Sequence, residues 1–291
     1  MKKTITYLYD LVLHPRNYFR FRSYYTKKIH RRFLYWLYYI KIRDRVKYVK
    51  NLKTQNNEIS FLLKNGYLKL DLTKEKELND LLDKIVEESN VFFNHYKKNS
   101  SKTIYKEYLI NLTTNYKEKN CDNLIKLEKN EKIVNLVGEY LDMLPTITFS
   151  AYWYSPFLKK THSGSQLIHL DHEEFKQIKM FVYCSDVKID NGPMHIINKK
   201  ESINIQKKIN YKTNEENKRL DDSSIDKKLI KDLSGNIKSI YLVDTSSCFH
   251  FGGRVSSGYR LMGVIQYLTP LSYNYKNLKK KLPVINKKNL I

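Results

Sequence analysis

The sequence predicts a mainly β protein with flanking helices (α+β). From about residue 146 onward, short stretches rich in Thr, Val, Ile, Phe and Tyr alternate with turn residues, which is typical of antiparallel strands. Two amphipathic helical patterns precede this region. The chain has 291 residues, of which 41% are hydrophobic, so it is long enough for one large domain with an appendage.

Residues 1–57 form a basic, aromatic-rich extension that we expect to be helical. The stretch 16–50 interleaves Lys and Arg with Tyr, Phe and Trp, contains a single acid, Asp44, and has no Gly. Three roles stay open for this extension. Its helices would pack on the main domain with solvated charges, lie on a membrane with Trp36 among the headgroups, or stack their rings on nucleic-acid bases. Packing is the favoured interpretation, and nucleic acid is the least favoured.

The next segment, 58–144, predicts helices around one early strand. Residues 59–72, "ISFLLKNGYLKLDL", indicate a strand or short helix that is broken at Gly66 and followed by a strand. An amphipathic helix then begins, for which Thr73 is the expected N-cap. Its apolar positions, such as Leu78, Leu82 and Ile85, recur at helical spacing. Residues 122–144 predict a second helical region.

Strands are expected in most of the remaining chain. The candidate strands are 146–155, 165–170, 177–186, 193–197, 238–243, 247–251 and 259–268. Residues 199–234 are polar and charged, so we expect a long excursion between strands with room for one short helix. Residues 276–291 form a basic tail.

Charge and cysteine content set the broad class. The formal net charge of +23 favours anionic partners such as nucleic acid, anionic lipid or an acidic substrate, although the abundance of Lys, Asn and Ile reflects genome composition in part. The three cysteines form no C-x-x-C pair, which favours a reducing, cytoplasmic location. No stretch approaches the length of a membrane span. The first residues do not resemble a signal peptide, because Asp10 interrupts their apolar run.

A metal site is indicated just before a predicted buried strand. His169 and Asp171 are separated by one residue, and a third ligand is expected from a distant strand, where His250 is available. Two histidines and one carboxylate form the facial triad of non-heme Fe(II) oxygenases, which leaves three metal positions for a chelating 2-oxoacid and dioxygen. A His-x-Asp pair alone is common by chance, so the downstream residues carry the inference.

A cation is needed at the far carboxylate of a 2-oxoglutarate cosubstrate. Arg260 lies ten residues after His250 and opens the next strand. Its planar guanidinium suits bidentate binding of a carboxylate and stays charged when buried. Arg254 competes for this role, but it follows Gly252 and Gly253 and is expected in an exposed turn.

These motifs resemble the phytanoyl-CoA dioxygenase family of Fe(II)/2-oxoglutarate oxygenases. The resemblance covers residues 58–275 and depends on an ordered set of motifs. The set comprises H-x-D at 169–171, "KMFVYCSDVKIDNGPM" at 179–194, "DTSSCFHFGG" at 244–253 and Arg260, with "NGYLKL" and "EYLDMLPTITFSAYWYS" upstream. The resemblance implies a double-stranded β-helix, that is, a cupin-like jelly-roll core.

The resemblance also implies residue roles and a reaction. His169, Asp171 and His250 correspond to the iron ligands, and Arg260 corresponds to the residue that pairs with 2-oxoglutarate. Lys179 is a weaker candidate for cosubstrate binding, since its strand face is the one turned to the cosubstrate in that family. The implied cofactors are Fe(II), 2-oxoglutarate and O2. The implied reaction hydroxylates an unactivated C–H bond of a small molecule and releases succinate and CO2.

Two positions refine this expectation. Asp171 is an acid and not the small residue of related halogenases, which favours hydroxylation. After Met194 the family continues into a Pro-Gly-Ser-His turn, whereas this chain reads "HIINKKES", so the loop at the pocket mouth is expected to differ. A small, anionic or acyl-type substrate is the expectation.

Two rival functions stay open. One is a catalytically idle jelly-roll protein that binds anionic membrane or nucleic acid through its basic N-terminal segment. The other is a jelly-roll enzyme of another class, such as a cupin-type isomerase, that uses the same triad with a different metal. Dependence of turnover on 2-oxoglutarate separates these possibilities from an oxygenase.

Overall fold

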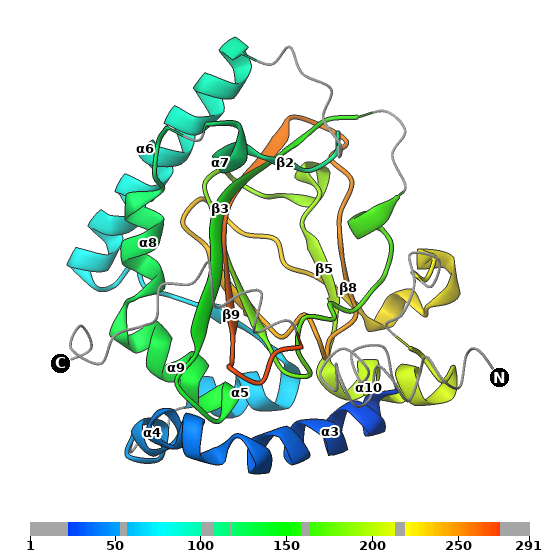
Figure 1. Ribbon diagram of the computed structural model, residues 1–291. Coiled ribbons are helices and arrows are strands. Elements are labelled where there is room, and N and C mark those ends of the chain that lie inside the picture. Colours follow the sequence, from blue (N-terminus) through cyan, green and yellow to red (C-terminus); the bar gives the residue numbers. More distant parts are fainter. Residues whose placement is uncertain are drawn as a thin grey trace, which may run out of the picture.

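Two antiparallel sheets form the centre of the molecule (Figure 1). The computed structural model describes residues 23–52, 57–99, 107–116, 118–158, 163–212 and 219–273. The larger sheet contains β1 (Tyr67–Leu70), β7 (Ile240–Val243), β4 (Ile178–Tyr183), β9 (Tyr259–Leu268), β3 (Thr146–Pro156) and β2 (Ile110–Asn111), in that order. The smaller sheet contains β6 (Ile230–Asp232), β5 (Met194–Ile197) and β8 (His250–Gly252), in that order. This is the predicted jelly-roll core with flanking helices.

The longest strand pair is β3 with β9, which are antiparallel from Thr146 opposite Leu268 to Pro156 opposite Tyr259. This pair is rich in β-branched and aromatic residues, as strands that are packed on both faces require. β4 pairs with β9 on one edge and with β7 on the other. β4 therefore lies inside the sheet, and the side chains of its inner face point between the two sheets.

Helices cover the outer face of the larger sheet (Figure 1). They are α5 (Asn57–Asn65), α6 (Lys76–Asn99), α7 (Leu112–Asn115), α8 (Asp122–Glu128) and α9 (Glu131–Leu141). Their apolar faces, which include Leu82 and Ile85, share one buried cluster with Ile178, Met180 and Val182 of β4. The alternate residues of β4 turn the other way, so the sheet buries both of its faces.

The space between the two sheets is filled from both sides. Phe181 and Tyr183 of β4 join Met194 and Ile196 of β5 in a second buried cluster. The predicted two-residue alternation along this strand is therefore present, and Lys179 lies on the same inner face.

Two local predictions were wrong. Thr73 is not the N-cap of α6, because its N–H and hydroxyl both bond to Asp71 Oδ1, at 3.2 and 2.7 Å, and the helix begins at Lys76. The segment 165–170 is not a strand. Residues 164–166 form a 3₁₀ turn, which begins at Gly164 with φ of 55°, and Ile168 and His169 make only isolated bridges.

The excursion after β5 contains more structure than expected. α10 (Lys199–Lys208) begins directly after β5, and the side chain of Asn198 caps it by accepting the N–H of Glu201 at 3.0 Å. This helix stands where the family pattern has a Pro-Gly-Ser-His turn. Later in the excursion, β6 adds an edge strand to the smaller sheet.

Two helices occupy the described part of the N-terminal extension, α3 (Tyr24–Leu37) and α4 (Tyr39–Lys50). Leu34, Ile42 and Val46 are buried against Met143 and Leu271 of the domain. Among the helices that the structure describes, none combines the length and the apolar content that crossing a membrane requires. The predicted basic tail, 276–291, lies outside the described residues.

The packing of α3 predicts different effects for two adjacent substitutions. Leu34 is 1% exposed and Phe33 is 50% exposed. Leu34→Ala should lower the free energy of unfolding by about 2–5 kcal/mol, while Phe33→Ala should change it by about 0.5 kcal/mol or less. Urea denaturation followed by circular dichroism measures both values. Equal effects of the two substitutions would show that α3 does not pack as described.

Candidate metal centre

Strand-like alternation directs two side chains inward just before β4. Ile168 and Leu170 pack outward in a buried cluster that also contains Phe249. His169 and Asp171, at the alternate positions, turn into a cavity between the sheets. The pattern of apolar residues in "IHLD" therefore fixes which face carries the polar groups.

His250 meets this segment through the backbone. The N–H of His169 donates to the carbonyl of His250, and the N–H of His250 donates to the carbonyl of His169, both at 3.0 Å. This isolated antiparallel bridge holds the two imidazole rings with their centroids 4.3 Å apart. Residues 81 positions apart in the sequence thus form one cluster.

The donor atoms of the three side chains converge. Asp171 Oδ1 lies 3.8 Å from His169 Nε2, and Asp171 Oδ2 lies 3.7 Å from His250 Nε2. All three donor atoms lie within 4.8 Å of one another. Donor atoms bonded to one ion at about 2.1 Å stand at most about 4.2 Å apart, so a slight inward rotation of the side chains completes a site. The three residues therefore fit a metal ion.

The imidazoles are oriented to offer their Nε2 atoms. Nδ1 of His169 lies 2.8 Å from the carbonyl of Leu167, and Nδ1 of His250 lies 3.1 Å from the carbonyl of Cys248. A carbonyl only accepts, so each Nδ1 carries the proton and each Nε2 presents a lone pair. Burial lowers the pKa of both histidines, which favours the neutral form that binds a metal.

Asp171 is held ionised. Burial opposes its charge, but the Lys179 ammonium, at 2.6 Å from Oδ2, and the two imidazoles hold the pKa of Asp171 below its usual range. The side-chain amide of Gln177 also donates to Oδ2, at 3.3 Å. The N–H of Asp171 donates to the carbonyl of Thr245 at 2.8 Å. A carboxylate with these partners is fixed in place and ready to bind a cation.

A cavity of about 280 Å³ adjoins the three side chains, and Lys179 and Arg260 also line it. Arg260 is 5% exposed. One of its terminal nitrogens donates to the carbonyl of Gly192, and the other donates to Ser155 Oγ at 3.1 Å. Its Nε has no partner, and none of the ion pairs among the described residues includes it. A buried guanidinium without a carboxylate partner favours binding of an anion.

The competing arginine is placed elsewhere. Arg254 is exposed, as expected for a turn after two glycines. His195, another histidine of this region, contacts Asp232 at 2.8 Å and stacks on Phe251, outside the triad. Cys184 and Cys248 are buried core residues.

Several residues in or beside the cavity escaped the sequence analysis. Gln177 contacts Asp171 and Thr245, and the two-residue period that includes Lys179 was the signal that could have found it. Arg219 lines the cavity and donates to the carbonyl of Gly164 at 2.7 Å, but it lies in a polar stretch without periodicity. Tyr108 lines the cavity from a segment without a motif.

Comparison with known proteins supports the fold. No protein-family model and no curated protein matches the sequence. Among solved structures, the chain is similar to the epimerase SnoN in complex with Fe3+, alpha ketoglutarate and nogalamycin RO, with TM-score 0.52 and 10% identity over 73% of this chain and 82% of that chain. A second structure of SnoN, described as a non-heme alpha ketoglutarate dependent epimerase from nogalamycin biosynthesis, gives TM-score 0.50 and 11% identity over 73% and 81%.

A further neighbour is HygX from Streptomyces hygroscopicus with nickel and 2-oxoglutarate bound, with TM-score 0.48 and 12% identity over 74% of this chain and 87% of that chain. At 10–11% identity the likeness to SnoN supports the fold alone, and the three converging side chains are an observation on this chain itself.

The geometry predicts selective loss of metal binding. His169→Ala should weaken Ni(II) binding by at least about 100-fold, because loss of a direct ligand costs more than loss of an outer partner. His195→Ala is the matched control and should leave binding unchanged. Isothermal titration calorimetry measures both affinities. Equal affinities of the two variants would exclude a metal centre at these residues.

Proposed function

We propose that this chain is an Fe(II)- and 2-oxoglutarate-dependent oxygenase similar to the phytanoyl-CoA dioxygenase family, with its catalytic domain in residues 58–275. The observation that carries the proposal is a His-Asp-His cluster that shares one cavity with a buried arginine lacking an acidic partner. Either feature alone also occurs in proteins of other classes, but an enzyme of this class needs both.

In this proposal His169, Asp171 and His250 would hold the iron. Iron with 2-oxoglutarate and dioxygen would supply the oxidising power, and succinate and CO2 would be released. The protein contributes a fixed, neutral imidazole pair and an ionised carboxylate. Lys179 neutralises part of the charge of Asp171 at 2.6 Å and keeps this carboxylate oriented.

Arg260 would bind the far carboxylate of 2-oxoglutarate. Its two bonds to Gly192 and Ser155 fix the guanidinium at the cavity wall. Gly192 has φ of 66°, and its backbone packs closely on Gly253, so the N-G-P and G-G motifs meet behind this arginine. Lys179 supplies a second cation facing the same cavity.

A small molecule is the proposed substrate, and hydroxylation is the proposed reaction. The remaining cavity wall includes Trp153, Tyr108 and Arg219, which suits a substrate with an apolar body and a negative group. These lining residues support an anionic or acyl-type compound as the substrate. The neighbour SnoN is described as an epimerase, so product analysis must separate hydroxylation from epimerisation.

The three buried free cysteines support a cytoplasmic location.

The cosubstrate assignment predicts a specific kinetic change. Arg260→Ala should raise the 2-oxoglutarate concentration for half-maximal succinate formation by about tenfold or more, because a charge-assisted bidentate contact is lost. Steady-state assays of succinate at varied 2-oxoglutarate measure this effect. Arg254→Ala is the control, because it removes an exposed arginine from the turn that precedes β9. An unchanged 2-oxoglutarate dependence of Arg260→Ala would remove Arg260 from this role.

A peripheral contact with an anionic membrane is a second candidate function, because α3 exposes an apolar row. The row comprises Ile29, Phe33, Trp36 and Leu37, which are 68, 50, 74 and 49% exposed. They occupy positions i, i+4, i+7 and i+8, which lie on one side of α3. Lys28 and Arg32 are exposed beside this row, as in helices that lie at a lipid surface.

Liposome sedimentation tests this contact. Ile29→Ala with Trp36→Ala should reduce binding to vesicles of phosphatidylserine and phosphatidylcholine several-fold, since both side chains would leave water on binding. The control pair Val91→Ala with Ile189→Ala removes similarly exposed apolar groups elsewhere, 45 and 61% exposed. Equal binding of both pairs, or no binding by the unaltered protein, would exclude this role for α3.

A further inference from the structure

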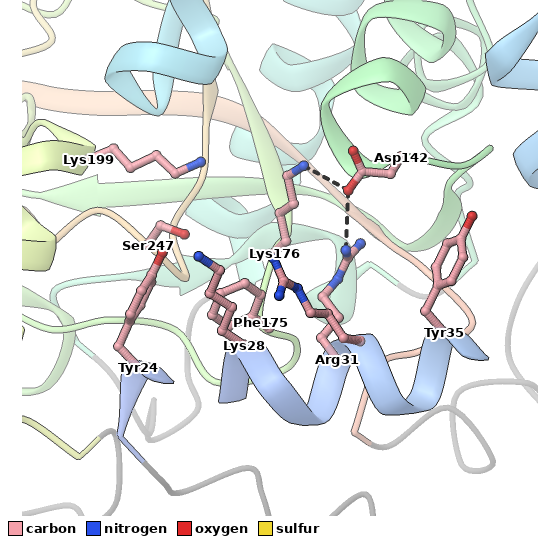
Figure 2. A pocket seen from close by; sticks show the side chains of 10 residues that line it. Tyr24, Lys28, Arg31, Tyr35, Asp142, Phe175, Lys176, Lys199 and Ser247 are labelled. Carbon is pink, nitrogen blue, oxygen red and sulfur yellow. Dashed lines mark hydrogen bonds and ion pairs between the residues drawn. The ribbon is translucent and has the colours of Figure 1, made fainter. Parts of the chain in front are cut away.

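A second cavity lies between α3 and the domain, away from the metal centre. It has a volume of about 380 Å³ and shares no lining residue with the first cavity. Its walls come from α3, from Asp142 at the end of α9, from the segment after Asp171, from the start of α10 and from the loop before His250. Figure 2 shows the lining side chains gathered above α3.

Cations dominate this cavity. Lys28, Arg31, Arg32, Lys176 and Lys199 line it, and Asp142 is the one acid among its lining residues. Asp142 Oδ2 already accepts from Arg31 at 3.2 Å and from Lys176 at 3.0 Å. Arg31 Nε also lies 3.7 Å from Glu174 Oε1, and Lys199 Nζ lies 4.0 Å from Asp244 Oδ2. Lys28 and Arg32 pair with no acid in the described part of the chain, so the positive charge of the cavity is only partly compensated from within the protein.

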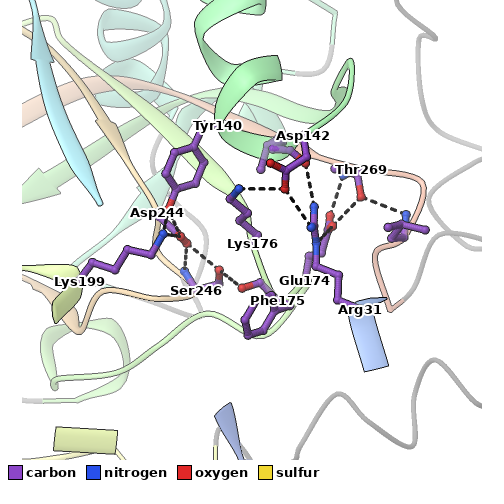
Figure 3. Close-up of polar contacts among 12 residues, drawn as sticks. Arg31, Tyr140, Asp142, Glu174, Phe175, Lys176, Lys199, Asp244, Ser246 and Thr269 are labelled. Atoms are coloured by element: carbon purple, nitrogen blue, oxygen red, sulfur yellow. Dashed lines mark hydrogen bonds and ion pairs between the residues drawn. The ribbon is translucent and has the colours of Figure 1, made fainter. Parts of the chain in front are cut away.

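Two partly buried lysines, Lys176 and Lys199, are held in position before any ligand arrives. The ring of Tyr140 lies under both ammonium groups, with its centroid 4.7 Å from Lys176 Nζ and 4.8 Å from Lys199 Nζ. Lys199 also donates to the Tyr140 hydroxyl at 2.8 Å, and that hydroxyl donates to Asp244 (Figure 3). Fixed cations lose little side-chain entropy when they bind an anion.

Burial makes an anion favourable at this position. The side chain of Lys176 is 13% exposed, and burial lowers its pKa, with Asp142 opposing this effect. In Figure 2 the ammonium groups of Lys28 and Lys199 point into the same space. Tyr24 and Phe175, whose ring centroids are 5.4 Å apart, supply an apolar wall beside it.

We propose that this cavity is a binding site for a phosphate group, which Lys28, Lys176 and Lys199 contact while Tyr24 and Phe175 pack against the attached organic part. A phosphate carries enough charge and enough acceptor oxygens to engage several lysines at once. The phosphate would belong to a soluble phosphomonoester or to a lipid headgroup, and the two sources present the same chemistry to the site. The site is independent of the proposed oxygenase activity.

A charge-matched pair of variants tests the site. Calorimetry with the full-length protein uses inorganic phosphate and glycerol 3-phosphate as soluble probes. Lys199→Gln should weaken binding by about tenfold, because one charge-assisted contact is lost. Lys200→Gln removes the same charge from the next residue of α10, which is exposed and does not line the cavity, and should leave the affinity unchanged. Equal weakening by both variants would overturn the proposal.

A third variant should change the affinity in the opposite direction. Asp142→Asn removes the carboxylate that competes with the ligand for Arg31 and Lys176. Asp142 has φ of 67° at the end of α9, a conformation that Asn tolerates, so folding should be retained. Phosphate binding should tighten several-fold, and weaker binding by a folded Asp142→Asn protein would contradict the proposal.

Vesicles separate the two phosphate sources. Phosphatidylcholine vesicles with and without phosphatidic acid are compared with glycerol 3-phosphate, for the unaltered protein and for Lys199→Gln. A Lys199-dependent preference for phosphatidic acid supports a lipid source, and Lys199-dependent binding of the soluble probe alone supports a phosphomonoester. Absence of Lys199-dependent binding to any of these probes overturns the site. All readouts are binding measurements, so a failed oxygenase assay would not affect them.

Discussion

The backbone bridge between His169 and His250 is the constraint on which the candidate site depends. Two mutual hydrogen bonds at 3.0 Å join a segment that precedes β4 to the first residue of β8. Since side chains alternate along extended backbone, this single pairing sets both imidazoles and Asp171 on one side and places Ile168, Leu170 and Phe249 in a separate apolar cluster. A shift of one residue would exchange the two sets.

Buried charge is the second feature that links structure to function. Lys179 and Asp171 compensate each other, but Arg260 has only neutral partners. A buried, uncompensated guanidinium lowers the stability of the fold, and the cost is removed when an anion binds. The cavity beside α3 also carries excess positive charge, since five cations and one acid line it. In both places the arrangement favours occupation by a small anion.

The sequence predicted the features that local patterns determine. The strand 259–268 was predicted with the observed bounds, and the inner face of β4 followed from its two-residue period. Residues that depend on tertiary contacts were missed. Arg219 lines the first cavity but lies in a polar stretch. Thr73 does not cap α6 because its N–H and hydroxyl bond to Asp71. Residues 164–166 form a 3₁₀ turn in place of the expected strand 165–170. The cavity beside α3 combines five segments, so no single stretch of sequence indicates it.

We propose that His169 and Asp171, together with the distant His250, hold one ferrous ion beside a bound 2-oxoacid. Anaerobic titration of the full-length protein with Fe(II) and then 2-oxoglutarate tests this most directly, because chelation of the iron by a 2-oxoacid produces a weak charge-transfer band in visible light. The band should appear, saturate at one equivalent of iron and be absent from Asp171→Ala. Absence of the band from the unaltered protein, or its persistence in Asp171→Ala, would contradict an iron site at these residues.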